Sequence, residues 1–119
     1  YLSDSFHKPT PFSPQVAVDI DDVVEKKLDM LHCHGSQMYE WLPYNSGRLE
    51  EVPESNQDRR VWLEHRLSGF SGIADRCREL LIGYYGKEKG QKVQYAEAFE
   101  ACEYGSALTD ENLPVLFPF

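Results

Sequence analysis

A long, regular hydrophobic repeat limits the conformations open to this chain. Between Asp21 and Leu42, apolar residues recur at intervals of three and four positions, which is the spacing of one face of an α-helix. Asp19, Asp21 and Asp22 are candidate caps for the first turn, and Pro43 follows the last one. The pattern predicts an amphipathic helix over 21–42 with an apolar stripe made of Val23, Val24, Leu28, Leu31, Met38, Trp41 and Leu42.

Prolines, glycines and changes of period divide the rest of the chain into shorter elements. Residues 1–14 contain several prolines and are expected to form a loop. A β-rich run predicts a strand over 15–20, and helical spacing predicts a broken helix over 58–85, with the break at 68–72. Alternation over 93–102 predicts a second strand, although its alanines and glutamates leave a helix as the alternative. The expected fold class is α/β, mostly helical with one or two short strands.

The composition narrows the classes of function. A length of 119 residues fits one domain or a large part of one, and a hydrophobic content of 41% is enough for a packed core. The formal net charge of -8 argues against nucleic-acid binding, which depends on a basic surface. Cys33, Cys77 and Cys102 form no closely spaced pair, which favours a reduced, cytoplasmic setting. No apolar run has the length of a membrane span.

The two ends of the sequence lead to two further expectations. The chain starts at Tyr1 rather than Met and shows no signal-peptide pattern, so we expect a processed or partial sequence. It ends in the apolar run 113–119, whose large side chains each contribute roughly 1.5–3 kcal/mol when buried. This run is therefore expected to pack against another part of the protein.

Two polar residues occupy core-facing positions of the first predicted helix. Lys27, Leu31, His34 and Met38 are spaced by four, three and four positions and so share one face. A buried polar group without a partner costs on the order of 1–3 kcal/mol, so each polar residue needs one. His34 is either a core histidine bonded to a carbonyl or carboxylate, or a support for a pocket. Lys27 either lays its stem along the core with its ammonium in water, or serves the same pocket.

The segment VDIDDVVEKKLDMLHCHGSQ, residues 18–37, contains a family signature. It resembles a pattern near the C-terminus of the LmbE / PIG-L family, in which a strand ending VDI or VDV precedes a helix, a lysine, six residues and His-x-Ser-Gln. The residues at the fixed positions of this pattern are Asp19, Lys27, His34, Ser36 and Gln37. The spacing between them matches the pattern without an insertion or a deletion. The segments 8–12 (KPTPF) and 95–99 (YAEAF) are also similar to segments of longer members.

This resemblance implies a Rossmann-like α/β fold and a metal-dependent de-N-acetylase that acts on an N-acetylated sugar-like substrate. Family members hold zinc through two histidines and an aspartate, and an HPDDE-type motif near their N-terminus supplies ligands and the general base. No such run occurs in this sequence. His32, Cys33 and His34 would point in different directions on a helix, so they do not form a metal site. Zinc is therefore expected in the parent protein and not on this chain alone.

The resemblance assigns supporting roles, and no catalytic residue, to this chain. His34 and Gln37 would brace the catalytic N-terminal half of the same protein, and Lys27 lies on the same helix. In the N-terminal loop, His7 and Phe12, together with Phe6, are candidates for the rim of a substrate pocket, although ordinary packing explains such aromatics equally well. The segment from Asn45 to Gly90 could shape specificity or form homo-oligomer contacts. Aromatic candidates for such a surface, or for the core, are Trp41, Tyr44 and Trp62.

Two alternatives to a de-N-acetylase fragment remain. The chain could be a non-catalytic helical interaction module, which would fold stably from these residues alone. It could also be an independent small enzyme, but no nucleophile with a nearby base, paired acids or phosphate-binding glycine loop is recognisable.

Overall fold

The computed structural model describes residues 11–66 and 69–119, and for 69–71 it describes the backbone only. The chain forms two compact units. The first unit combines Tyr1–Asp21 with Phe70–Phe119, and the second is Asp22–Gly69. The described part is mostly helical with one two-stranded sheet. Within these residues, no helix combines the length and apolar character that crossing a membrane requires.

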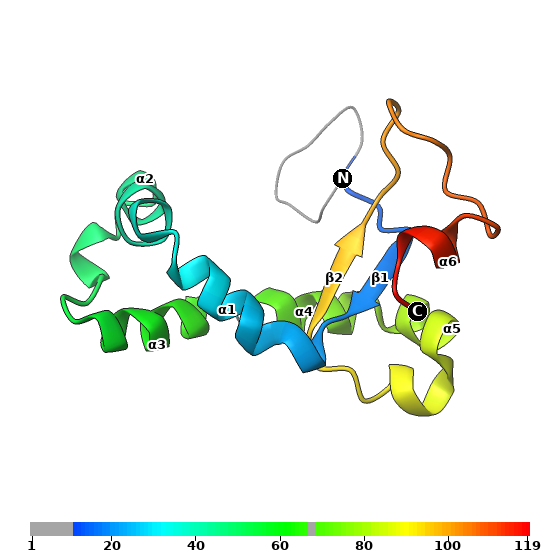
Figure 1. Cartoon of the computed structure of the whole chain (residues 1–119), viewed down its shortest axis with the longest axis horizontal. Coiled ribbons are helices and arrows are strands. Elements are labelled where there is room, and N and C mark those ends of the chain that lie inside the picture. Colours follow the sequence, from blue (N-terminus) through cyan, green and yellow to red (C-terminus); the bar gives the residue numbers. More distant parts are fainter. Residues whose placement is uncertain (1–10, 67–68) are drawn as a thin grey trace. The chain divides into compact units, whose positions relative to one another are not determined.

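The sheet of the first unit is formed by one strand from near the start of the sequence and one from near its end. Strand β1 (Val16–Asp19) and strand β2 (Ala96–Phe99) lie side by side and antiparallel, with Val16 opposite Phe99 and Asp19 opposite Ala96 (Figure 1). Both strands predicted from the sequence are thus present. The second is shorter than the predicted 93–102, because the backbone N–H groups just before β2 donate to a side-chain carboxylate instead of a neighbouring strand.

Strand β1 is buried on both faces, which explains its unbroken apolar run. Alternate residues point to opposite faces of a sheet, and Ala17 therefore belongs to a different cluster from Val16 and Val18. The Ala17 cluster includes Ile73 and Ala74 of helix α4 (Gly69–Arg76), Leu81 of helix α5 (Arg78–Gly90), and Cys77 between the two helices. The strand residues that belong to this cluster are all alanines, Ala17, Ala96 and Ala98. Their small side chains leave room for the larger residues of α4 and α5.

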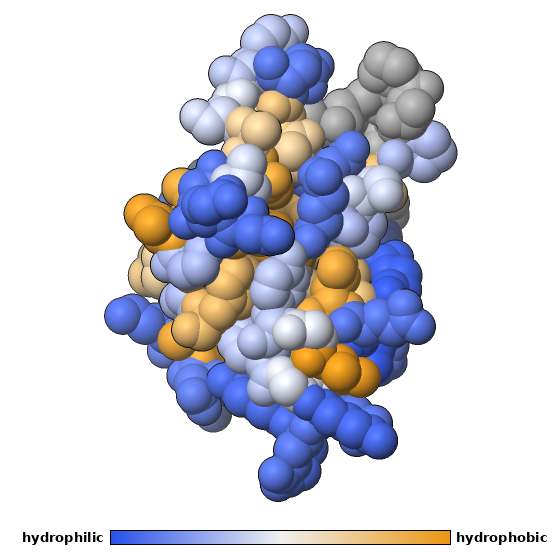
Figure 2. All heavy atoms as spheres, turned by 90° about the vertical axis from the view of Figure 1, so that its right-hand side faces the viewer, coloured by the Kyte–Doolittle hydropathy of each residue, from blue (hydrophilic) through white to orange (hydrophobic). Residues whose placement is uncertain are grey.

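The C-terminal apolar run packs onto the first unit itself. Helix α6 (Leu113–Leu116) is followed by Phe117, which lies 5.3 Å from Phe99 between ring centroids. The last residue, Phe119, stacks on Tyr84 with a centroid distance of 4.3 Å. Apolar side chains still occur as separate patches among hydrophilic ones on the face that carries α5 and α6 (Figure 2). Phe117 and Phe119 thus contact the first unit, whereas Val115 and Leu116 are 84% and 57% exposed, so the expected packing of 113–119 is found only in part.

Three helices replace the single broken helix predicted over 58–85. They are α3 (Asn56–Arg66), α4 and α5, and α4 starts at Gly69, inside the predicted break at 68–72. A further break occurs at Cys77, whose φ of -103° and ψ of 19° are not helical. Gly86 interrupts α5 with a φ of 79°, a left-handed value that favours glycine, before a last turn to Gly90.

The predicted continuous helix over 21–42 is wrong. Helix α1 (Val24–His32) follows a 3₁₀ turn (Asp21–Val23) and ends at His32. After the turn at 33–34 the chain resumes as the π-helical segment η2 (Gln37–Trp41) and helix α2 (Leu42–Asn45). The break is local, because the N–H groups of 33 and 34 bond to carbonyls three residues back and so tighten the last turn of α1. Pro43 lies in the first turn of α2, where no helical hydrogen bond to its nitrogen is needed.

The second unit has its own core between α1 and α3. Leu28, Tyr39 and Leu63 are buried there. The half-buried residues around them are Leu31, Met38, Val52 and Trp62. Arg60 on α3 joins Glu25 and Asp29 on α1 at 2.7 and 2.8 Å. A 3₁₀ turn (Leu49–Glu51) connects α2 to the segment before α3.

Candidate functional site

The His-x-Ser-Gln motif runs from the turn after α1 into η2, with His34 in the turn and Gln37 as the first residue of η2. The carbonyl of His34 accepts the N–H groups of Gln37 at 3.1 Å and Met38 at 2.9 Å, so its backbone starts the next helical segment. Its imidazole is exposed, because the break after His32 removes His34 from the core-facing stripe. The predicted core-facing placement of His34 is therefore wrong, whereas Leu31 and Met38 of the same stripe do pack on the core.

Lys27 lies half-buried on α1, one residue before the buried Leu28. Partial burial lowers the pKa of its ammonium below the ordinary value, because the charged form loses hydration. This agrees with a lysine whose stem lies along the edge of the core.

An open groove of about 560 Å³ lies against the face of η2 and α2. Its lining residues are Ser36, Gln37, Glu40, Trp41, Tyr44 and Leu49. Of the predicted site residues only Gln37 belongs to it. Trp41 is 57% exposed and Tyr44 is 68% exposed, so neither ring contributes to the core. Sequence reasoning named both aromatics as surface candidates but missed Glu40, although the i, i+3, i+4, i+7 spacing of 37, 40, 41 and 44 places all four on one side of a helix.

His32, rather than His34, is the histidine with a structural partner. Its Nδ1 lies 2.6 Å from the hydroxyl of Tyr39, and the two rings meet edge to face at 5.6 Å. The Tyr39 ring is buried, and this burial raises the pKa of its hydroxyl, opposed by the positive charges of Arg59 and Arg60. The pair ties the end of α1 to η2 and so fixes the turn between them. Sequence analysis missed it because it treated 21–42 as one helix, where positions 32 and 39 would lie two turns apart.

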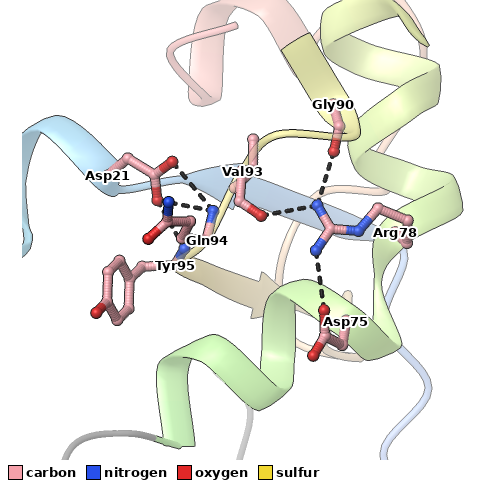
Figure 3. A network of polar contacts seen from close by, with 7 residues as sticks. All are labelled: Asp21, Asp75, Arg78, Gly90, Val93, Gln94 and Tyr95. Carbon is pink, nitrogen blue, oxygen red and sulfur yellow. Dashed lines mark hydrogen bonds and ion pairs between the residues drawn. The ribbon is translucent and has the colours of Figure 1, made fainter. Parts of the chain in front are cut away.

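Two carboxylates of the first unit accept hydrogen bonds from backbone N–H groups. Asp21 accepts the N–H of Gln94 at 3.0 Å and that of Tyr95 at 2.6 Å, just before β2 (Figure 3). Asp19 accepts the N–H of Asp21 at 3.0 Å and pairs with Lys89 at 3.2 Å. These bonds join the end of β1 to the start of β2 and to α5.

Arg78 forms the second half of this network. Its guanidinium donates to the carbonyls of Gly90 at 2.8 Å and Val93 at 2.7 Å and pairs with Asp75 at 3.0 Å (Figure 3). It therefore satisfies the carbonyl at the end of α5 and fixes the segment that leads to β2. A polar hollow of about 350 Å³ lies beside it, but the charged groups on its wall already bond to this chain.

Phe12 is the remaining predicted site residue within the described part of the chain, and it lies in the first unit. Phe12 is half-buried and packs against the cluster around Ala17 and Leu81, which is the ordinary-packing alternative for this ring. His7 and Phe6 lie outside the described residues. The structure brings Gln37 close to the turn at His34, and Phe12 belongs to a different unit from both.

Over 11–66 and 69–119, no three His, Cys, Asp or Glu side chains gather in a way that could hold a metal. Comparison of the chain with models of protein families, with curated proteins and with solved structures finds no match.

Proposed function

We propose that this chain is the C-terminal portion of a metal-dependent de-N-acetylase of the LmbE / PIG-L type, with a Rossmann-like fold in the parent protein. One observation carries the proposal, namely the spacing of Asp19, Lys27, His34, Ser36 and Gln37. Its local structure supports the assignment, because the pattern requires a strand, a helix and then a turn. Strand β1 ends at Asp19, α1 carries Lys27, and the turn contains the histidine of the motif.

In this proposal the N-terminal half of the same protein carries out the reaction. This chain holds the substrate or the catalytic half in position. The described residues supply no ligand set for zinc, so the metal and its general base belong to the other half. Gln37 offers an exposed amide at the groove, and Ser36 offers a hydroxyl beside it. Both can donate and accept hydrogen bonds, which suits the contact with a polar substrate or with the neighbouring half. His32 and Tyr39 hold the turn that presents them.

The test uses the intact gene product, assayed for metal content and for acetate release from N-acetylglucosamine derivatives. Gln37→Ala is expected to lower kcat/KM about tenfold, the effect of one lost hydrogen bond of ~1.4 kcal/mol, at an unchanged unfolding midpoint. Gln57→Ala is the matched control, because Gln57 is an exposed glutamine on α3 outside the groove. It should leave both quantities unchanged.

Two results would overturn the proposal. One is an intact protein that binds no divalent metal and releases no acetate. The other is a gene that encodes no HPDDE-type motif ahead of Tyr1.

A further inference from the structure

The groove beside the His-x-Ser-Gln turn has two exposed aromatic rings at its centre. Trp41 and Tyr44 are three residues apart and so lie on the same side of the helical segment. The opposite side of this segment is buried, with Tyr39 at 3% exposure and Pro43 fully buried. The rings are therefore exposed on a segment that is otherwise anchored in the core, and they give the groove an apolar surface.

Polar groups border these rings. Ser36 and Gln37 lie one turn before Trp41, and Glu40 is adjacent to it. Glu40 carries the one carboxylate among the residues that line the groove, and no hydrogen bond or ion pair joins it to another residue of the described part. The groove thus combines an apolar floor with hydrogen-bonding groups and a carboxylate.

These features of the groove favour some classes of ligand over others. An apolar helix or a lipid chain would cover the rings but would bury the Glu40 carboxylate without a partner, which is costly. A nucleic acid would be repelled by that charge and by the net charge of -8. A pyranose ring has a flat face of C–H groups that packs on aromatic rings and an edge of hydroxyls that bond to amides and carboxylates. A cationic amino group on the sugar would complement Glu40.

We propose that this groove binds a 2-amino sugar, with the C–H face of the pyranose on Trp41 and Tyr44 and the ammonium at Glu40. The volume of about 560 Å³ falls within the range of small-molecule sites. The choice of an amino sugar rests on the proposed function, because de-N-acetylation of an N-acetylated sugar releases one. The stacking surface itself does not depend on that reaction.

Saturation-transfer NMR on the full 119-residue chain at pH 6 tests the site with the disaccharide of glucosamine as probe. Signals from the sugar C–H protons are expected, and Trp41→Ala should weaken binding at least tenfold. The N,N′-diacetylated disaccharide should bind about threefold to fivefold more weakly, the size of an exposed ion pair. Glu40→Gln should remove this difference and leave the acetylated sugar unaffected.

Matched variants separate the groove from other surfaces. Tyr104→Ala removes a ring that is 90% exposed in the first unit, and Glu54→Gln removes an exposed carboxylate outside the groove. Neither should change binding of either disaccharide. Each variant is first checked for an unchanged unfolding midpoint, and Tyr44→Ala provides a second test of the stacking surface if Trp41→Ala unfolds.

Three outcomes would overturn the inference. They are the absence of saturation transfer, equal transfer in Trp41→Ala and Tyr44→Ala, and concentration-dependent self-association abolished by Trp41→Ala, which would make the rings a contact between copies. The test is separable from the proposed function. Sugar binding at Trp41 with no acetate release by the intact protein would remove only the de-N-acetylase, whereas acetate release without sugar binding here would remove only this site.

Discussion

At the scale of single residues, a position can accept only glycine where neighbouring backbone leaves no space for a Cβ atom. A Cβ built on Gly90 would lie 2.6 Å from Ile82 Cα, Ile82 N and Leu81 O, which are backbone atoms that cannot rotate away. A Cβ on Gly83, in the same helix, would meet nothing within 4 Å. Position 90 of α5 therefore has no space for a side chain, whereas position 83 has. The sequence alone does not distinguish these two glycines.

Gly90→Ala is expected to destabilise the chain by about 2–3 kcal/mol, because overpacking forces a backbone shift. Gly83→Ala should raise stability by up to about 1 kcal/mol, because alanine favours a helix where space is free. Urea unfolding followed by circular dichroism measures both. Equal effects of the two substitutions would show that helix propensity, and not the contact with Ile82, decides the outcome.

Tyr39 makes a pH-dependent contribution to stability. Its pKa is raised in the folded chain, so the folded state holds the proton more tightly than the unfolded one. The resulting stabilisation is complete below the unfolded pKa of about 10 and is lost as pH rises through the higher folded pKa. Tyr39→Phe should cost about 1 kcal/mol at pH 7 by removing the bond to His32, and the difference from wild type should shrink above pH 10.

Urea unfolding at a series of pH values measures this difference. Tyr104→Phe is the control, since Tyr104 is 90% exposed. A Tyr39→Phe difference that stays constant from pH 7 to 11 would exclude the linkage.

At the scale of elements, the periodic pattern predicted part of a core correctly but not the ends of the helices. Leu28, Leu31 and Met38 pack on one core, as their spacing predicted, whereas Val23, Trp41 and Leu42 of the same predicted stripe are exposed. The backbone nevertheless breaks after His32, because a turn followed by a π-helical segment brings Met38 back to the core. Hydrophobic spacing is insensitive to such compensated breaks of the backbone. This is why His34 was placed at the core and its neighbour His32 was overlooked.

Helix α3 begins with a side-chain cap at Ser55. The hydroxyl of Ser55 accepts the N–H of Asp58 at 3.1 Å and donates to the Asp58 carboxylate at 2.7 Å. Ser55→Ala is expected to destabilise the chain by about 1 kcal/mol, the usual effect of losing an N-cap. Ser106→Ala, in an exposed loop, should have no effect in the same urea titration. An unchanged midpoint for Ser55→Ala would mean that water replaces the cap.

At the scale of the whole molecule, the sequence predicted two strands but not their pairing. Antiparallel pairing of Val16 with Phe99 joins residues from opposite ends of the chain, and no local pattern specifies such a contact. The groove was equally hard to predict, because exposure of Trp41 depends on which side of η2 meets the core. Long-range packing decides both features. The identity of the chain's partners remains a prediction from the family signature.

The two units have separate cores, and this predicts separate responses to core mutations. Leu63 is buried in the second unit and Leu81 in the first, and no residue belongs to both of their clusters. Leu→Ala at either site leaves a cavity that costs roughly 2–5 kcal/mol. Leu63→Ala is therefore expected to speed amide hydrogen exchange in α1 and α3 while β1 and β2 keep their protection, and Leu81→Ala should do the reverse. Loss of protection in both units from either substitution would instead mean that the chain unfolds as one cooperative body.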